Sequence, residues 1–203
     1  MLILGLTGGI ACGKSHVASV LAAMGCRVLD GDRIARTLTE PDGAALPDIR
    51  AAFGAGMLDA NGALNRKALG QLIFHDPAAR AKLDAIMQPL IRSRIEAALR
   101  EKTEAVTVLE MPLLFEQQLD WLCDRVWCVS LPENKQLSRL MLRDGLTEQQ
   151  AMERIRSQLP LADKRMRSDV VIDTSGTHDM TADAVRLLLA NEQKLWLERI
   201  PHE

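Results

Sequence analysis

The sequence of 203 residues has little net charge and lacks a long apolar run. Its 25 Lys and Arg against 27 Asp and Glu give a formal net charge of −2, so a general polyanion-binding function is not expected. No apolar run reaches the roughly 18 residues of a membrane-spanning helix. The apolar N-terminal run is too short for a secretory signal and lacks a basic flank. We therefore expect a cytoplasmic protein without nucleic-acid or membrane partners.

Cysteines and histidines are also few, four of each, and scattered. Cys12, Cys26, Cys123 and Cys128 form no C-x-x-C pair, which argues against structural zinc and against a disulfide framework. Cys26 and Cys128 lie in apolar, strand-like segments and are predicted to be buried, reduced thiols. Cys12 precedes Lys14 near a predicted helix N-terminus. There its thiol pKa could fall, or it is simply a small residue that the turn tolerates.

A glycine-rich turn near the N-terminus carries the strongest functional signal. The segment Gly8–Ser15 fits G-x-x-x-x-G-K-[ST], and it follows an apolar run, Leu2–Leu6, short enough to be a buried strand. In such a loop successive N–H groups surround phosphate oxygens, and the helix beginning near Gly13 adds its positive end. Lys14 can then reach the β- and γ-phosphates, and the Ser15 hydroxyl can bind Mg²⁺. The motif predicts a nucleoside triphosphate site, with a chance glycine turn as the alternative.

The remaining pattern alternates strands with helices. Apolar segments predict further strands over residues 26–29, 105–110, 124–130 and 168–173. With the first strand these predict one α/β domain, built on a five-stranded parallel sheet with helices on both faces. A last helix is expected over about 181–198. Its residues expected against the sheet are Val185, Leu188, Leu189, Leu195 and Trp196.

Carboxylates follow two of the predicted strands. Asp30 and Asp32 end the second strand, at the edge where open α/β sheets bind their ligands. Helix N-capping explains one of them more readily than both, so we favour a catalytic or metal-binding role for Asp32. Glu110 ends the strand 105–110 in a Walker B layout, where a carboxylate supports Mg²⁺ directly or through water.

A helical block separates the second and third strands. Residues 37–64 are turn-rich, Asn65 is a helix cap, and Asp76-Pro77 is a second helix start. Pro89 falls inside the long helix that follows, so a kink or a break is expected there. The block is predicted to be an insertion that carries the acceptor substrate.

An arginine-rich helical hairpin follows the fourth strand. Pro132 opens its first helix and Gly145 closes it, and Arg139 and Arg143 share one face. Thr147 begins a capping box for the next helix. The arginines are either a solvated face or a lid that brings guanidinium groups onto phosphate, and we favour the lid.

Taken together, these segments resemble dephospho-coenzyme A kinase, a P-loop family that phosphorylates the ribose 3′-hydroxyl of dephospho-CoA to give coenzyme A. The resemblance spans essentially the whole chain. It rests on the order of short segments at residues 5–15, 30–36, 64–66, 73–74, 112–116, 139–146 and 169–176.

The resemblance implies a core over residues 1–59 and 101–203, a CoA-binding insertion over about 60–100, and a lid over about 140–165. It implies ATP and dephospho-CoA as substrates and Mg²⁺ as the metal; a monomer or weak homo-oligomer is expected. Catalytic roles fall to Asp32, Lys14 and Arg143, and metal contacts to Ser15 and Glu110. The implied nucleotide-binding residues are Gly8, Gly9, Ile10, Ala11, Cys12, Gly13, Lys14, Ser15, His16, Arg139 and Gly176.

Five residues depart from the family pattern. Ala11 and Cys12 replace a usual Gly-Ser, so Ala11 needs a backbone angle that a Cβ tolerates or a shifted loop. Gln88 stands for a histidine, Glu110 for an aspartate, and Thr174 for an asparagine near the expected adenine site. Two rival functions stay open: another small-molecule or nucleoside monophosphate kinase, and a module that senses ATP without transferring phosphate.

Overall fold

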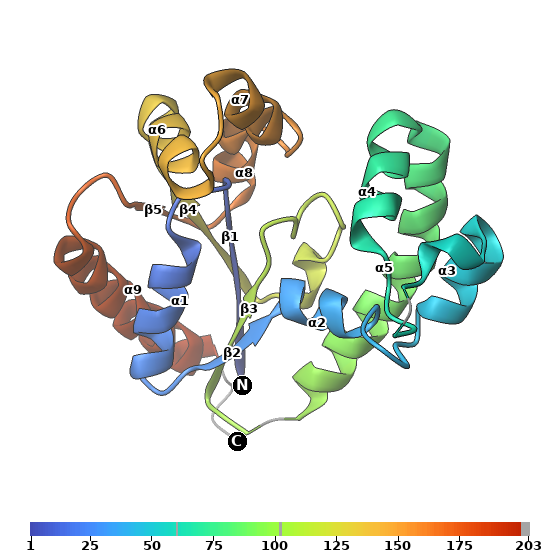
Figure 1. Cartoon of the computed structure of the whole chain (residues 1–203). Coiled ribbons are helices and arrows are strands. Elements are labelled where there is room, and N and C mark those ends of the chain that lie inside the picture. Colours follow the sequence, from blue (N-terminus) through green and yellow to red (C-terminus); the bar gives the residue numbers. More distant parts are fainter. Residues whose placement is uncertain (60, 102, 200–203) are drawn as a thin grey trace. The chain divides into compact units, whose positions relative to one another are not determined.

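The computed structural model describes residues 1–59, 61–101 and 103–199 (Figure 1). The chain divides into two compact units, Met1–Leu29 with Lys102–Glu203, and Asp30–Glu101. No helix within the described residues is long and apolar enough to cross a membrane.

The first unit is built on the predicted five-stranded sheet. Its strands lie in the order β2-β3-β1-β4-β5, so the strand that leads into the glycine-rich turn is central. β1 pairs in parallel with β3 and with β4, and β4 pairs in parallel with β5. The strands are β1 Leu2–Gly8, β2 Arg27–Asp30, β3 Val106–Glu110, β4 Arg125–Ser130 and β5 Val170–Asp173.

Helices cover the sheet of the first unit on both faces. Helix α1 (Lys14–Ala23) and helix α9 (His178–Arg199) lie side by side, and α9 contacts β5 (Figure 1). Helix α8 (Leu161–Arg167) contacts β1 and β4. Burying this much apolar surface against one sheet is the main stabilising term for such a layered fold. The core joins every second residue of β1 to apolar residues of α1 and α9, among them Leu2, Leu4, Leu6, Val17, Leu21, Val185 and Leu189.

The predicted lid segment lies within the first unit and is helical. Helix α6 (Glu133–Asp144) ends at Gly145, which adopts the left-handed conformation expected of a C-terminal cap (φ 64°). Helix α7 (Glu148–Arg156) begins with a capping box in which Thr147 and Gln150 exchange hydrogen bonds, as predicted. A short 3-10 helix, Asp120–Leu122, precedes β4.

The described residues of the second unit form mainly helices and turns, with one isolated antiparallel bridge between Leu58 and Leu64. Helix α2 (Gly31–Thr37), helix α3 (Leu46–Phe53) and helix α4 (Arg66–His75) each contact α5 (Pro77–Arg100), and a 3-10 turn spans Ala55–Met57. Asn65 caps α4 and Asp76 caps α5, as their positions predict. The compact unit includes residues 30–59 as well as the segment 60–100 for which acceptor binding is expected.

Two local predictions differ from the structure. Helix α5 continues through Pro89 without a break, and its buried residues Ile91, Ile95 and Leu99 follow the proline. Burial of that apolar face offsets the one backbone hydrogen bond that the proline removes. Leu195 was predicted to face the sheet, but it is 47% exposed.

The stripe of α9 that faces the core explains the second difference. It runs through Val185, Leu189, Glu192 and Trp196, at steps of three and four residues. Glu192 is buried and pairs with Arg125, Nε to Oε2 3.2 Å. A charged residue, Glu192, fills a core-facing position, and the apolar pattern alone wrongly added Leu195 to the stripe.

Candidate active site

Glycines shape the turn between β1 and α1. Gly8 has φ 148°, and a Cβ there would collide with the carbonyl oxygen of Val129 in β4. Gly13, the residue before α1, has φ 89°, and no side chain caps this helix. A glycine-rich turn that opens onto an uncapped helix N-terminus is a ready site for an anion.

Ala11 and Cys12, the two residues of this turn that depart from the family pattern, are accommodated in different ways. Ala11 adopts the left-handed conformation (φ 59°), so the backbone accepts a Cβ there rather than shifting the loop. Cys12 is fully buried in the hydrophobic core. Burial raises the pKa of the Cys12 thiol and outweighs the nearby Lys14, so of the two interpretations the structure excludes a fall in pKa and leaves the small residue that the turn tolerates. Cys26 and Cys128 are buried thiols, as predicted.

Lys14 lies inside the curve of the loop. Its ammonium Nζ donates to the carbonyl oxygens of Gly8 (3.3 Å) and Gly9 (3.0 Å), and the residue is only 9% exposed. The loop therefore holds a positive charge where the motif places phosphate, with the side chain already ordered before a ligand arrives.

Ser15 and Glu110 present oxygen donors at one edge of the sheet. Ser15 is exposed in the first turn of α1, and Glu110 is the last residue of β3. Glu110 is in register with Leu6 of β1, two residues before Gly8. A hydroxyl and a carboxylate are ligands that Mg²⁺ accepts, and it commonly takes the rest from phosphate and water. No group of three or more His, Cys, Asp and Glu among the described residues forms a metal site of its own.

The loop that follows β5 is fastened to the glycine-rich turn. Thr174 is buried, and its hydroxyl donates to the carbonyl oxygen of Cys12 (2.7 Å). Arg139 of α6 donates from Nη2 to the carbonyl oxygen of Thr174 (3.0 Å). The threonine that departs from the family pattern thus holds the loop, and its side chain is turned toward backbone.

His16 lies in α1, and Gly176 lies in the loop between β5 and α9. The ring of His16 stacks on the ring of His178 at the start of α9, with centroids 4.3 Å apart and planes at 21°. Its Nε2 is 3.1 Å from the carbonyl oxygen of His178. A Cβ on Gly176 would lie 3.2 Å from the sulfur of Met180, so this turn is tightly packed. His16 therefore contacts the start of α9, and Gly176 packs against a residue of the same helix.

Arg143 is held by an acidic partner on the lid segment. Asp144 accepts from Arg143 Nε (2.7 Å) and Nη2 (3.1 Å), and it also accepts from Arg154 Nη1 of α7 (2.8 Å). The hydrogen bond from Arg143 lowers the pKa of the Asp144 carboxyl, and the same bond raises the pKa of Arg143. Asp144 thereby joins α6 to α7 and orders two guanidinium groups.

Asp32 is the predicted catalytic residue that belongs to the second unit. It lies in the first turn of α2, two residues beyond the end of β2, and its side chain is exposed. The competing explanation, helix capping, applies to Asp30, whose Oδ1 accepts from the N–H of Arg33 (2.9 Å). Capping therefore accounts for Asp30.

The structure adds residues that the sequence did not single out. Lys164 of α8 is fully buried, and its Nζ bonds to Glu116 Oε1 and to the carbonyl oxygen of Pro112, both at 2.7 Å. Gln136 and Gln158 bond to the glycine-rich turn itself. Lys164 belongs to a run of basic residues that is typical of a protein surface. Gln136 and Gln158 belong to no motif that predicts a functional glutamine. Composition therefore gave no signal for any of them.

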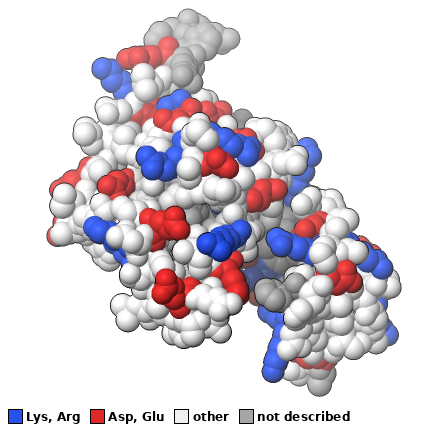
Figure 2. Space-filling model, turned by 90° about the horizontal axis from the view of Figure 1, so that it is seen from above, with Lys and Arg blue, Asp and Glu red and all other residues white. Residues whose placement is uncertain are grey.

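Charged side chains of both signs are interspersed on the face seen in Figure 2. This distribution agrees with the formal net charge of −2. Binding of an anionic ligand must then depend on local groups such as Lys14 rather than on a general field.

Comparison with known proteins identifies the family. The model of the family "CoaE: Dephospho-CoA kinase" matches residues 2–179. The chain belongs to the dephospho-CoA kinase family. A dephospho-CoA kinase from Syntrophotalea carbinolica is 46% identical over 193 residues, which cover 94% of this chain and 92% of that protein.

Solved structures agree with the family. TT1252 from Thermus thermophilus matches with a TM-score of 0.80 and 31% identity, covering 94% of this chain and 97% of that one. A dephospho-CoA kinase from Campylobacter jejuni matches with a TM-score of 0.71 and 26% identity, covering 95% and 97%. The dephospho-CoA kinase matches thus extend over both compact units, well beyond the phosphate-binding turn.

Proposed function

We propose that this chain transfers the γ-phosphoryl group of ATP to the ribose 3′-hydroxyl of dephospho-CoA, the last step of coenzyme A biosynthesis. The observation that carries the proposal is the family match over residues 2–179, which includes the phosphate loop and the helical second unit. The ordered Lys14 inside that loop independently supports the binding of a nucleoside triphosphate. ATP is the donor, and Mg²⁺ is the accompanying metal.

The chain's own groups divide the work of phosphoryl transfer. Backbone N–H groups of Gly8–Ser15 hold the phosphates, and Lys14 offsets charge on the oxygens of the transferring group. Ser15 and Glu110 would hold Mg²⁺, which neutralises charge on the β- and γ-phosphates when bound. His16, Arg139 and Gly176 complete the nucleotide site.

Two further residues act on the acceptor and on the transferring group. Asp32 orients the 3′-hydroxyl and accepts its proton. Because the transition state of phosphoryl transfer is loose, orientation of the hydroxyl contributes as well as removal of its proton. Arg143 adds positive charge from the lid segment, residues 140–165, once the lid covers the phosphates.

The helical second unit supplies the acceptor site, chiefly through residues 60–100. The division of the chain supports this proposal, because the second unit is mainly helical and the nucleotide-binding motif lies entirely in the first unit. We further propose that the protein works in the cytoplasm as a monomer or weak homo-oligomer, without nucleic-acid or membrane partners.

A single substitution at the proposed base tests the mechanism. Asp32→Asn keeps the shape of the side chain and removes its basicity, so we expect kcat with dephospho-CoA to fall about 10²- to 10⁴-fold with little change in the KM for ATP. Asp30→Asn is the matched control, because asparagine also caps helices and should leave kcat near the parent value. Unchanged turnover in Asp32→Asn would remove this residue from the mechanism.

Acceptor competition separates the rival functions. Purified protein with ATP and Mg²⁺ should phosphorylate dephospho-CoA faster than a nucleoside monophosphate or shikimate. A faster reaction with either rival acceptor would overturn the assignment. ATP binding without transfer to any of the three would indicate the sensing module instead.

A further inference from the structure

Both backbone hydrogen-bonding groups of Ile10, at the tip of the phosphate loop, are bound by glutamine side chains. Gln136 of α6 donates from Nε2 to the carbonyl oxygen of Ile10 (2.9 Å). Gln158, between α7 and α8, accepts at Oε1 from the N–H of Ile10 (3.0 Å). A backbone N–H can only donate and a carbonyl oxygen only accept, so the two contacts fix how each carboxamide is turned.

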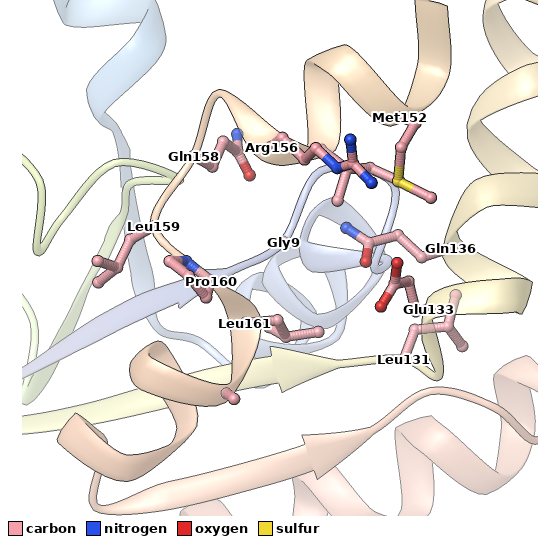
Figure 3. Close-up of a pocket in the computed structure, with 12 residues that line it drawn as sticks. Gly9, Leu131, Glu133, Gln136, Met152, Arg156, Gln158, Leu159, Pro160 and Leu161 are labelled. Atoms are coloured by element: carbon pink, nitrogen blue, oxygen red, sulfur yellow. The ribbon is translucent and has the colours of Figure 1, made fainter. Parts of the chain in front are cut away.

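The surroundings of the tip show why these two bonds matter. A cavity of about 360 Å³ lies between the loop, α6 and the α7–α8 segment, and both glutamines line it together with Gly9. Figure 3 shows Gln136 and Gln158 on different sides of this cavity, with Gly9 between them. On the side of the loop that faces the cavity there are no packed side chains, so the support on that side comes from hydrogen bonds.

The two contacts to Ile10 affect the rest of the phosphate loop, because Ile10 lies inside a tight turn. Cys12 N–H bonds to the carbonyl oxygen of Gly9 (3.3 Å), which closes a tight turn around Ile10 and Ala11. Ala11 sits in the left-handed conformation that an alanine adopts only under constraint (φ 59°). Holding Ile10 at both groups therefore fixes the direction in which the following N–H groups, up to Ser15, face the phosphates.

We propose that Gln136 and Gln158 are positioning residues for the phosphate loop. They hold Ile10 from two elements of the first unit, α6 and the segment between α7 and α8, and thereby keep the loop shaped for a triphosphate before one binds. Both elements border or belong to the segment proposed as the lid, so these two side chains join that segment to the phosphate loop. The inference rests on the proposed function only in taking the loop as a nucleoside triphosphate site.

Binding of ATP to the full-length protein without any acceptor is the test. Gln136→Met and Gln158→Met remove the polar group at similar length, and each is expected to raise the Kd for ATP about tenfold, the effect of losing one well-placed hydrogen bond. Gln149→Met is the control, because Gln149 is exposed on α7 and donates to the side chain of Glu153 on the same helix (3.1 Å). Its Kd should stay within about twofold of the parent.

Glutamate substitutions separate positioning from general packing. Gln158→Glu keeps an oxygen that accepts from Ile10 N–H, whereas Gln136→Glu removes the donor and sets a carboxylate against a carbonyl oxygen. Amide hydrogen exchange across residues 8–15, measured without nucleotide so that phosphate repulsion is absent, should stay near the parent rate in Gln158→Glu. It should rise in Gln136→Glu. Equal exchange in the two variants would overturn the proposal.

The remaining outcomes are also decisive. If both methionine variants fold and bind ATP as the parent does, or if Gln149→Met weakens binding as much, the glutamines do not position the loop. If Gln136→Met fails to fold, Gln158→Met and Gln158→Glu carry the test alone. A wrong acceptor assignment leaves these results unchanged, whereas a parent that binds no ATP overturns the proposed function and this inference together.

Discussion

Ala11 has a conformation that its own side chain opposes. A residue with a Cβ in the left-handed region loses about 1 kcal/mol or more relative to the right-handed one, and glycine does not. The chain keeps alanine at φ 59° because its neighbours Ile10 and Cys12 are held by other groups. The phosphate loop therefore stores a small strain at its least typical position.

Replacing this residue by glycine should relieve that strain. In Ala11→Gly the gain is partly offset by the greater freedom of glycine in the unfolded chain, so the free energy of unfolding is expected to be unchanged or up to about 1 kcal/mol higher. Ala184→Gly, on the exposed side of α9, should lower it by about 1 kcal/mol. Urea denaturation of both variants checks this. A loss in Ala11→Gly as large as in Ala184→Gly would contradict the account.

The thiols give a second prediction at this scale. Cys12, Cys26 and Cys128 are buried, and burial raises the pKa of Cys123 to about 12 and of Cys128 to about 11. At pH 8 we expect iodoacetamide to modify the folded protein slowly at all four cysteines and the urea-unfolded protein rapidly. Saturating ATP should add no protection at Cys12. Rapid native labelling of Cys12 that ATP suppresses would show that this thiol faces the phosphates.

The raised thiol pKa values also predict how the free energy of unfolding depends on pH. A thiol whose folded pKa is raised stabilises the folded state fully below its unfolded pKa, near 9, and that contribution is lost as the pH rises through the folded value. The free energy of unfolding should therefore fall between about pH 9 and pH 12. Cys123→Ser should show a shallower alkaline loss than the parent in pH-dependent urea denaturation. An equal alkaline slope in Cys123→Ser and the parent would show that groups other than Cys123 cause the loss.

Among the elements, α8 is joined to the loop after β3 by a buried charge. Lys164 is fully buried and pairs with Glu116, whose Oε1 also accepts from the N–H of Leu159 (2.9 Å). The same ammonium bonds to the carbonyl oxygen of Pro112. The pair thus anchors the end of the lid segment to the turn that follows the Walker B strand.

Breaking this pair on one side should be costly. Lys164→Met leaves the Glu116 carboxylate without its cation, and we expect the free energy of unfolding to fall by about 3 kcal/mol, at the low end for buried pairs because Glu116 is partly exposed. Glu116→Gln with Lys164→Met leaves no lone charge and should be more stable than Lys164→Met alone. Arg186→Met, which breaks an exposed pair with Asp183, should cost under about 1 kcal/mol. A double variant less stable than the single one would contradict this.

Most elements of this fold can be predicted from the sequence because local chemistry determines them. Caps at Asn65, Asp76 and Thr147 and the stop at Gly145 need only the residues beside them. Strand and helix ends differ from prediction by at most three residues and mostly by one, because the ends of helices and strands are less sharply determined than their middles. A break at Pro89, one of the two outcomes predicted there, does not occur because tertiary burial, which periodicity does not weigh, continues the helix.

At the scale of the whole molecule, the central position of β1 organises the first unit. The chain passes from β3 on one side of β1 to β4 on the other, so the phosphate loop lies at the point where the strand order reverses, a usual ligand site in open α/β sheets. The motif made this position predictable. The buried Lys164, the fastening by Thr174 and the two glutamines were not, because each depends on a partner far away in the sequence.

The position of the transferred phosphate tests the central claim most directly. Phosphorus NMR of the product formed from ATP, Mg²⁺ and dephospho-CoA should show one new phosphate monoester on the ribose 3′-carbon, and the 3′-deoxy analogue of dephospho-CoA should yield no product. Phosphate at any other position, or equal turnover of the 3′-deoxy analogue, would contradict the assignment of this chain as the kinase of that hydroxyl.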